Sequence, residues 1–165
     1  MLNKMTDSKK NERLNSIIES RLMEMSNSIK VPKKLLIRKG RSIYGEKFYY
    51  TDSSCFKNRF RFSYYIERYS KNLITNIVEY EYEANEFYFE GTKAFDEFIN
   101  TISLLLIQLK KINERNVVFS VHINDGKDIF DDDIEIHLSF FKYRNHCVDM
   151  CKSLISDSDI IVYMN

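Results

Sequence analysis

Residues 93–113, KAFDEFINTISLLLIQLKKIN, carry the strongest structural signal in the chain. Their large apolar side chains recur at intervals of three and four residues, which is the spacing of one helix face. These side chains are Phe95, Phe98, Ile99, Ile102, Leu105, Leu106, Leu109 and Ile112. Thr92 is the predicted N-cap, and Asp96 near the start and Lys111 near the end suit the helix dipole. The stretch therefore predicts a long amphipathic helix against which a sheet packs.

Alternating sequences follow this helix and predict strands. In residues 117–123 and 134–140, apolar and polar residues alternate, which is typical of half-buried strands. One loop separates the two segments, so we expect them to pair as an antiparallel hairpin. Residues 146–155 then show helical spacing. Residues 159–163, in which an aspartate precedes four apolar residues, predict a final strand.

A second amphipathic helix is predicted near the start of the chain. Apolar residues recur at helical spacing over residues 7–27, and Pro32 prevents the helix from continuing. The basic stretch over residues 33–41 is compatible with a short edge strand or with a loop. Residues 47–50 follow a glycine-containing turn and predict a strand.

Three segments rich in aromatic residues predict a meander of antiparallel strands. They span residues 59–67, 74–83 and 86–90. The elements together predict an α+β fold: a mainly antiparallel sheet, made of this meander and the hairpin, packed against the long central helix, with an N-terminal and a short C-terminal helix. With 165 residues, we expect one domain spanning residues 1–165, its first few residues mobile.

The composition excludes several classes of protein. Hydrophobic residues make up 44% of the chain, which is too many for an intrinsically disordered protein. No apolar run approaches the roughly 18 residues that a membrane span requires, and the polar first residues do not resemble a secretory signal. Three scattered cysteines do not form a disulfide framework. We therefore expect a cytoplasmic protein that does not enter a membrane.

Charge is divided unevenly along the chain. Residues 1–72 contain 17 Lys and Arg against 7 Asp and Glu, whereas residues 73–165 contain 8 against 17. Such asymmetry indicates charged partners. The alternative is that the two halves fold against each other and neutralise one another.

Acidic residues form two clusters in the second half of the chain. On the predicted strand 74–83, Glu79, Glu81 and Glu83 share one face, and Glu86 continues the run. The second cluster lies in and after the predicted hairpin loop and consists of Asp125, Asp128, Asp131, Asp132, Asp133 and Glu135. Both clusters are predicted to bind a cationic protein partner, because complementary potential speeds association and gives specificity. The alternative is a solvated face and a solubilising loop.

A second hypothesis assigns the chain to nucleic acid. Arg59 and Arg61 alternate with aromatic residues, and residues 30–41 add further basic side chains, which together suit phosphates and stacked bases. His122 and His137 lie on the polar faces of the two hairpin strands. A histidine pair can supply the general base and the general acid for metal-independent RNA cleavage.

Metal sites and cofactors are not predicted. Cys147 and Cys151 stand four residues apart beside His146, but a four-ligand zinc site needs a second cluster that the sequence does not supply. Two small apolar side chains in a core explain the cysteines more simply. Residues 124–128 are rich in aspartate and glycine, but their spacing departs from that of an EF-hand calcium loop.

In size, composition, order of elements and clustered acids, the chain resembles the small immunity proteins of bacterial polymorphic-toxin and contact-dependent inhibition systems. No diagnostic motif carries this resemblance, so it assigns no individual residue. It implies a non-enzymatic inhibitor that binds one toxin domain, often a nuclease, and covers its basic substrate site with acidic side chains.

Overall fold

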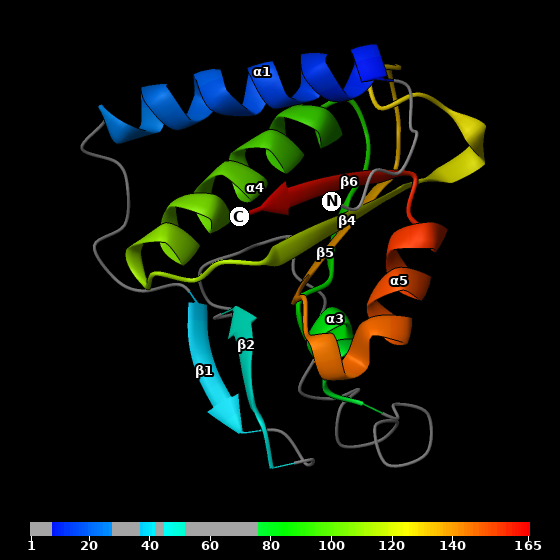
Figure 1. The fold of residues 1–165 in the computed structure, drawn as a ribbon. Helices are drawn as coiled ribbons and strands as arrows, with labels where there is room; N and C mark the ends of the chain where they lie inside the picture. The colour runs from blue at the N-terminus through cyan, green and yellow to red at the C-terminus, as the bar shows by residue number, and fades with distance from the viewer. Residues whose placement is uncertain (1–7, 28–36, 42–44, 52–75) are drawn as a thin grey trace.

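A computed structural model of the chain describes residues 8–27, 37–41, 45–51 and 76–165. The fold consists of a four-stranded antiparallel sheet with helices on both faces and a separate two-stranded hairpin (Figure 1). The predicted α+β class and the mainly antiparallel sheet are confirmed.

The main sheet is built around two long central strands. Its order is β3 (Phe87–Phe89), β5 (Ile136–Lys142), β4 (Val117–Ile123) and β6 (Ile160–Met164), and each neighbouring pair is antiparallel. The register pairs Phe119 with Phe140 on β4 and β5, so the predicted hairpin is confirmed. The predicted final strand is β6.

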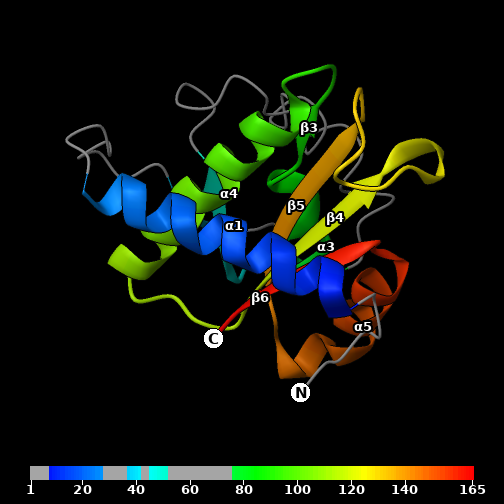
Figure 2. The same cartoon turned by 90° about the horizontal axis from the view of Figure 1, so that it is seen from above.

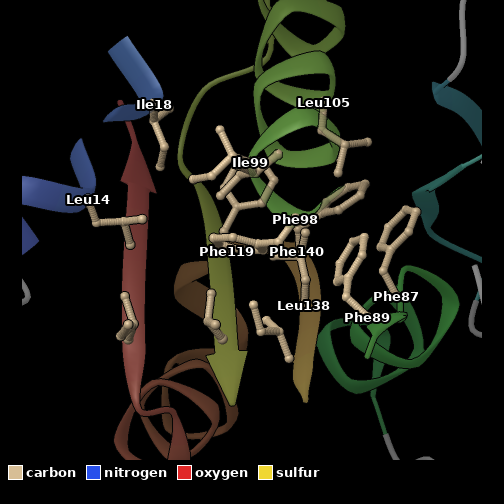
Figure 3. Packing of buried hydrophobic residues seen from close by; sticks show 14 of the residues in the cluster. Leu14, Ile18, Phe87, Phe89, Phe98, Ile99, Leu105, Phe119, Leu138 and Phe140 are labelled. Atoms are coloured by element: carbon tan, nitrogen blue, oxygen red, sulfur yellow. The ribbon is translucent and has the colours of Figure 1, made fainter. Parts of the chain in front are cut away.

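Two long helices cover one face of the sheet. They are α1 (Ser8–Ser26) and α4 (Ala94–Lys111), and seen from above α1 lies across the strands beside α4 (Figure 2). Phe98 and Ile99 of α4 meet Phe119 and Phe140 of the central strands in the core (Figure 3). All four of these side chains are buried, so α4 has the packing role that its apolar stripe predicts.

Two shorter helices, α3 (Ile77–Ala84) and α5 (Val148–Asp157), cover one end of the opposite face. A second buried cluster lies beneath them and consists of Ile77, Val78, Tyr80, Ala84, Val118, Phe141, Cys151 and Ile155. Val118 and Phe141 come from the central strands. The apolar side chains of these strands are therefore buried on both faces at this end of the sheet.

The two-stranded hairpin consists of β1 (Ile37–Arg41) and β2 (Lys47–Thr51). The backbone N–H of Thr51 donates to the side-chain carbonyl of Asn85 at 3.1 Å, and both residues are buried. This bond joins the end of β2 to the end of α3.

The predicted strand over residues 74–83 is wrong, because most of this segment forms α3. The Asn76 side chain accepts a hydrogen bond from the backbone N–H of Glu79 at 2.9 Å and caps the helix. The meander is therefore wrong as well, since β3 pairs with β5 instead of with residues 74–83. The predicted strand 59–67 lies outside the described residues, as do the first few residues of the chain.

The start of α4 also differs from the prediction. Lys93 occupies the N-cap position without a side-chain cap, so Thr92 is not the cap. A turn closed by the backbone bond from Ala94 N–H to the Gly91 carbonyl, 3.1 Å long, leads into the helix instead. Gly91 has a φ of 85°, which suits glycine.

Candidate functional site

Glu81 is buried, and the prediction that it lies on an exposed acidic face is wrong. A helix turns by about 100° per residue, so alternate residues on α3 point in different directions. The Arg144 guanidinium donates to both carboxylate oxygens of Glu81, at 3.0 and 2.9 Å. The Lys142 backbone N–H donates to the same carboxylate. Burial alone would lower the pKa of Arg144, but Glu81 outweighs it and raises that pKa.

Three other glutamates, two on α3 and one just after it, lie close enough to repel one another. Glu79, Glu83 and Glu86 are all half-buried. Burial raises the pKa of Glu83 to about 7, and the charges of Glu86 and Glu79 add to this effect. Negative potential is therefore concentrated at this point of the surface.

Replacing Glu83 by glutamine is expected to stabilise the protein at about pH 8 and to change its stability little at about pH 4. The folded chain holds the Glu83 proton with a pKa of about 7, compared with an ordinary value of 4.5. This contribution to stability is complete below the ordinary pKa and is lost as the pH rises through about 7. Glutamine cannot ionise and avoids that loss.

Urea unfolding at the two pH values measures this difference. Glu12→Gln is the matched control, because Glu12 is exposed on α1. An effect of Glu83→Gln that is equal at both pH values would contradict the prediction.

The two strand histidines lie opposite each other in the sheet, since His122 of β4 pairs with His137 of β5. His122 Nε2 lies 3.1 Å from the Tyr82 hydroxyl and 3.3 Å from the Ser120 hydroxyl. His137 Nδ1 lies 3.6 Å from a Glu86 carboxylate oxygen. The sequence placed both histidines on the polar faces of two hairpin strands, and the register makes them direct neighbours there.

The surroundings of this histidine pair are acidic. Burial raises the pKa of the Tyr82 hydroxyl against the effect of its hydrogen bond with Ser120, and the charges of Glu86, Glu83 and Asp157 raise it further. These three charges, from the described part of the chain, are all negative. Negative charges at this position favour a cationic group over a phosphodiester.

The acidic surface continues along β3. The Tyr88 ring meets His137 edge to face, with centroids 4.7 Å apart, and its hydroxyl donates to Glu90 at 3.4 Å. Desolvation raises the pKa of Tyr88, as do Glu135 and Glu90. We call Glu83, Glu86, Glu90 and Glu135 the edge acids, because they lie along the β3 side of the sheet.

The loop between β4 and β5 holds the other predicted cluster. Four of its carboxylates are exposed: Asp125, Asp131, Asp132 and Asp133. Asp128 is half-buried and forms an ion pair with Lys10 of α1, which lowers the pKa of Asp128. Glu135 is half-buried and accepts a hydrogen bond from the Asn124 side chain. The loop therefore presents four of its six predicted docking residues as exposed carboxylates.

Contacts with α1 and within the loop hold these aspartates in place. The Arg13 guanidinium lies 4.0 Å from the centre of the Phe130 ring. The Asp131 carboxylate accepts the Asp128 backbone N–H at 2.7 Å, and the Lys127 ammonium donates to the Asp133 carbonyl at 3.0 Å. These contacts give the acidic loop a defined conformation.

A pocket of about 280 Å³ lies between the start of α1, this loop and the start of β6. Lys10 and Asp128 line it and pair with each other, and Lys127 and Asp159 line it as well. Since both signs of charge are present, the pocket does not select a ligand by charge.

The two cysteines at the start of α5 belong to the packing of this helix. Cys151 is buried in the second core cluster, and Cys147 packs against that cluster. Burial raises the pKa of both thiols. Within residues 8–27, 37–41, 45–51 and 76–165, no group of three His, Cys, Asp or Glu side chains is arranged to hold a metal ion.

Several predicted binding residues cannot be placed. Arg59 and Arg61 lie outside the described residues, as does most of the basic segment 30–41 apart from the backbone of β1. Sequence reasoning missed Tyr82, Tyr88 and Asp157, which border the histidines and the edge acids. The helical spacing of Ile77, Val78, Glu81 and Ala84 was the signal that would have placed Tyr82 at the end of a helix.

In the part of the chain that the structure describes, no helix combines the length and the apolar character needed to cross a membrane. Comparison with protein-family models, curated proteins and solved structures finds no match to this chain.

Proposed function

We propose that this protein is a non-enzymatic, cytoplasmic binding protein of the immunity type, which neutralises a basic toxin or nuclease domain by covering its cationic surface. The observation that carries the proposal is the crowding of half-buried acids on α3 and just after it, where burial and the charges of Glu86 and Glu79 raise the pKa of Glu83 to about 7. A lysine or arginine from a partner would relieve this repulsion.

The edge acids and the acidic loop have complementary roles in this proposal. The exposed aspartates of the loop attract the partner over a distance, since long-range potential speeds encounter. The edge acids, of which Glu83, Glu86 and Glu135 are half-buried and Glu90 is exposed, then contact individual basic side chains beside His137 and Tyr88. Steric and electrostatic blockage needs no chemistry from the inhibitor itself.

Capture from a lysate of the producing cells, with the purified protein as bait and mass spectrometry as readout, is the first test. The proposal requires recovery of one basic partner with a toxin or nuclease domain, whose activity is lost on addition of this protein. Recovery of abundant housekeeping proteins alone would count against it.

Reversing three loop charges together (Asp131→Lys, Asp132→Lys and Asp133→Lys) is expected to weaken binding of that partner by about tenfold to a hundredfold at low salt. The loss should be smaller at high salt, because screening shortens the reach of exposed charges. Isothermal titration calorimetry at the two ionic strengths measures it.

The control for this experiment reverses three glutamates of α1, Glu12, Glu19 and Glu24, which changes the net charge equally. This control should weaken binding much less. Equal losses in the two triple variants would show a general charge effect and would remove the loop from the interface.

One observation favours the alternative of RNA binding or cleavage, namely the direct pairing of His122 with His137. A gel-shift series against salt tests it, because a nucleic-acid complex weakens steeply as salt is added. Incubation with labelled RNA, with and without His122→Ala, tests cleavage. Our proposal expects no shift at low salt and no cleavage.

A further inference from the structure

The two edges of the main sheet are protected to very different degrees. The β3 edge has three residues and is flanked by Glu86 and Glu90. Short length and charge are the usual means of preventing an edge strand from pairing with another chain. The β6 edge has the sequence Ile-Ile-Val-Tyr-Met, with neither charge nor proline. Among the described strands it bonds only to β4, and no labelled element lies in front of it in Figure 1.

We propose that β6 pairs with β6 of a second copy of this chain, antiparallel, and joins two four-stranded sheets into one continuous sheet. This interface lies at the opposite edge from the edge acids. Each copy in the dimer would keep its β3 edge free, and the inference does not depend on the function proposed above.

Charge at the two ends of β6 selects a reversed copy of the same strand as its partner. Asp159 immediately precedes the strand and Asp157 is the last residue of α5; both are exposed, and Lys127 lines a pocket with Asp159. The other end has a net positive charge: Met164 pairs with Val117, the exposed Arg115 lies two residues before Val117, and the neighbouring Glu114 is paired with Lys142. Antiparallel pairing brings the acidic end of one copy to the basic end of the other, whereas parallel pairing would place like charges side by side.

The strand also fits itself sterically. A two-fold axis beside Val162 lets all five residues pair and places Tyr163 of each copy opposite Ile161 of the other. Tyr163 is 43% exposed, and its hydroxyl donates to the Asn116 side chain at 3.0 Å. An aromatic residue opposite a β-branched one is a favourable cross-strand pair, so pairing would cover this ring.

Sedimentation equilibrium over a range of protein concentrations tests the proposal. The expected result is a reversible dimer whose dissociation constant rises by about tenfold or more in Tyr163→Lys. Asp157→Arg and Arg115→Asp should each weaken the dimer, and the double variant should recover much of the loss, since it restores opposite charges at the meeting ends. Glu12→Arg, on α1, is the control and should leave the dimer unchanged.

A cysteine cross-link tests the position of the axis with a mild substitution. In Val162→Cys the two thiols of a dimer lie opposite each other, and paired antiparallel strands have Cα spacings of about 4.5–5.5 Å, within reach of a disulfide. Diamide should link this variant much faster than the wild-type chain with its own cysteines. A protein that is monomeric at every concentration would overturn the proposal. So would a dimer that does not cross-link through Val162→Cys and whose stability does not change in the Asp157 and Arg115 variants.

Discussion

Replacing Glu81 by alanine is expected to destabilise the fold by about 3–5 kcal/mol, measured by urea unfolding at neutral pH. The Glu81 carboxylate is buried and accepts two hydrogen bonds from Arg144 and one from the Lys142 backbone. Its removal leaves a guanidinium that is largely buried and a backbone N–H without their acceptor. An uncompensated buried charge is among the costliest single changes that a fold can receive.

Two further variants separate this effect from a general loss of charge. Glu24→Ala removes an exposed glutamate that lies 3.4 Å from Arg21 on α1, and should cost no more than about 0.5 kcal/mol. The double variant Glu81→Leu with Arg144→Leu removes both buried charges and should recover much of the stability that Glu81→Ala loses. If Glu81→Ala were as mild as Glu24→Ala, the buried pair would not hold α3 to the sheet.

Phe98→Ala is expected to destabilise the protein by about 3–5 kcal/mol, because the ring is fully buried and its loss leaves a cavity. Phe98 meets Phe89 edge to face, with centroids 6.1 Å apart, and lies between α4 and the sheet (Figure 3). The free energy of unfolding from urea titration measures the loss.

Phe95→Ala is the matched control on the same helix. Phe95 is only half-buried and contacts Phe130 of the acidic loop at 5.6 Å between ring centres. It should cost clearly less than Phe98→Ala, since water already reaches part of the ring. Similar costs for the two variants would contradict the assignment of Phe98 to the centre of the core.

Periodicity predicted the elements that bury one clear face. The apolar residues of α4, spaced by three and four, fall on one face only in a helix, and those of β4 and β5 fall on one face only in a strand. The structure has these elements within a few residues of the predicted bounds. It failed at residues 74–83, where Val78, Tyr80 and Tyr82 alternate with glutamates and imitate a strand. The Asn76 cap stabilises a helix there, and the helix packs against both the sheet and α5.

The same error limited what could be predicted about the site. Interpreted as a strand, this segment placed Glu79, Glu81 and Glu83 together on the surface; as a helix it buries Glu81 against Arg144. The approach of Arg144, 63 residues further along the chain, depends on tertiary structure and has no local signal. The loop aspartates were easier to predict, because a short polar connection between paired strands has to lie at the surface.

The uneven cover of the two central strands has a consequence for their dynamics. Near Val118 and Phe141, helices cover both faces of the β4–β5 pair. Near His122 and His137, polar side chains replace the apolar packing on one face. Fewer apolar contacts mean that this part of the pair opens locally at a lower free energy than the whole fold. The two strands are therefore expected to open first at the histidine end, while the far end keeps their register.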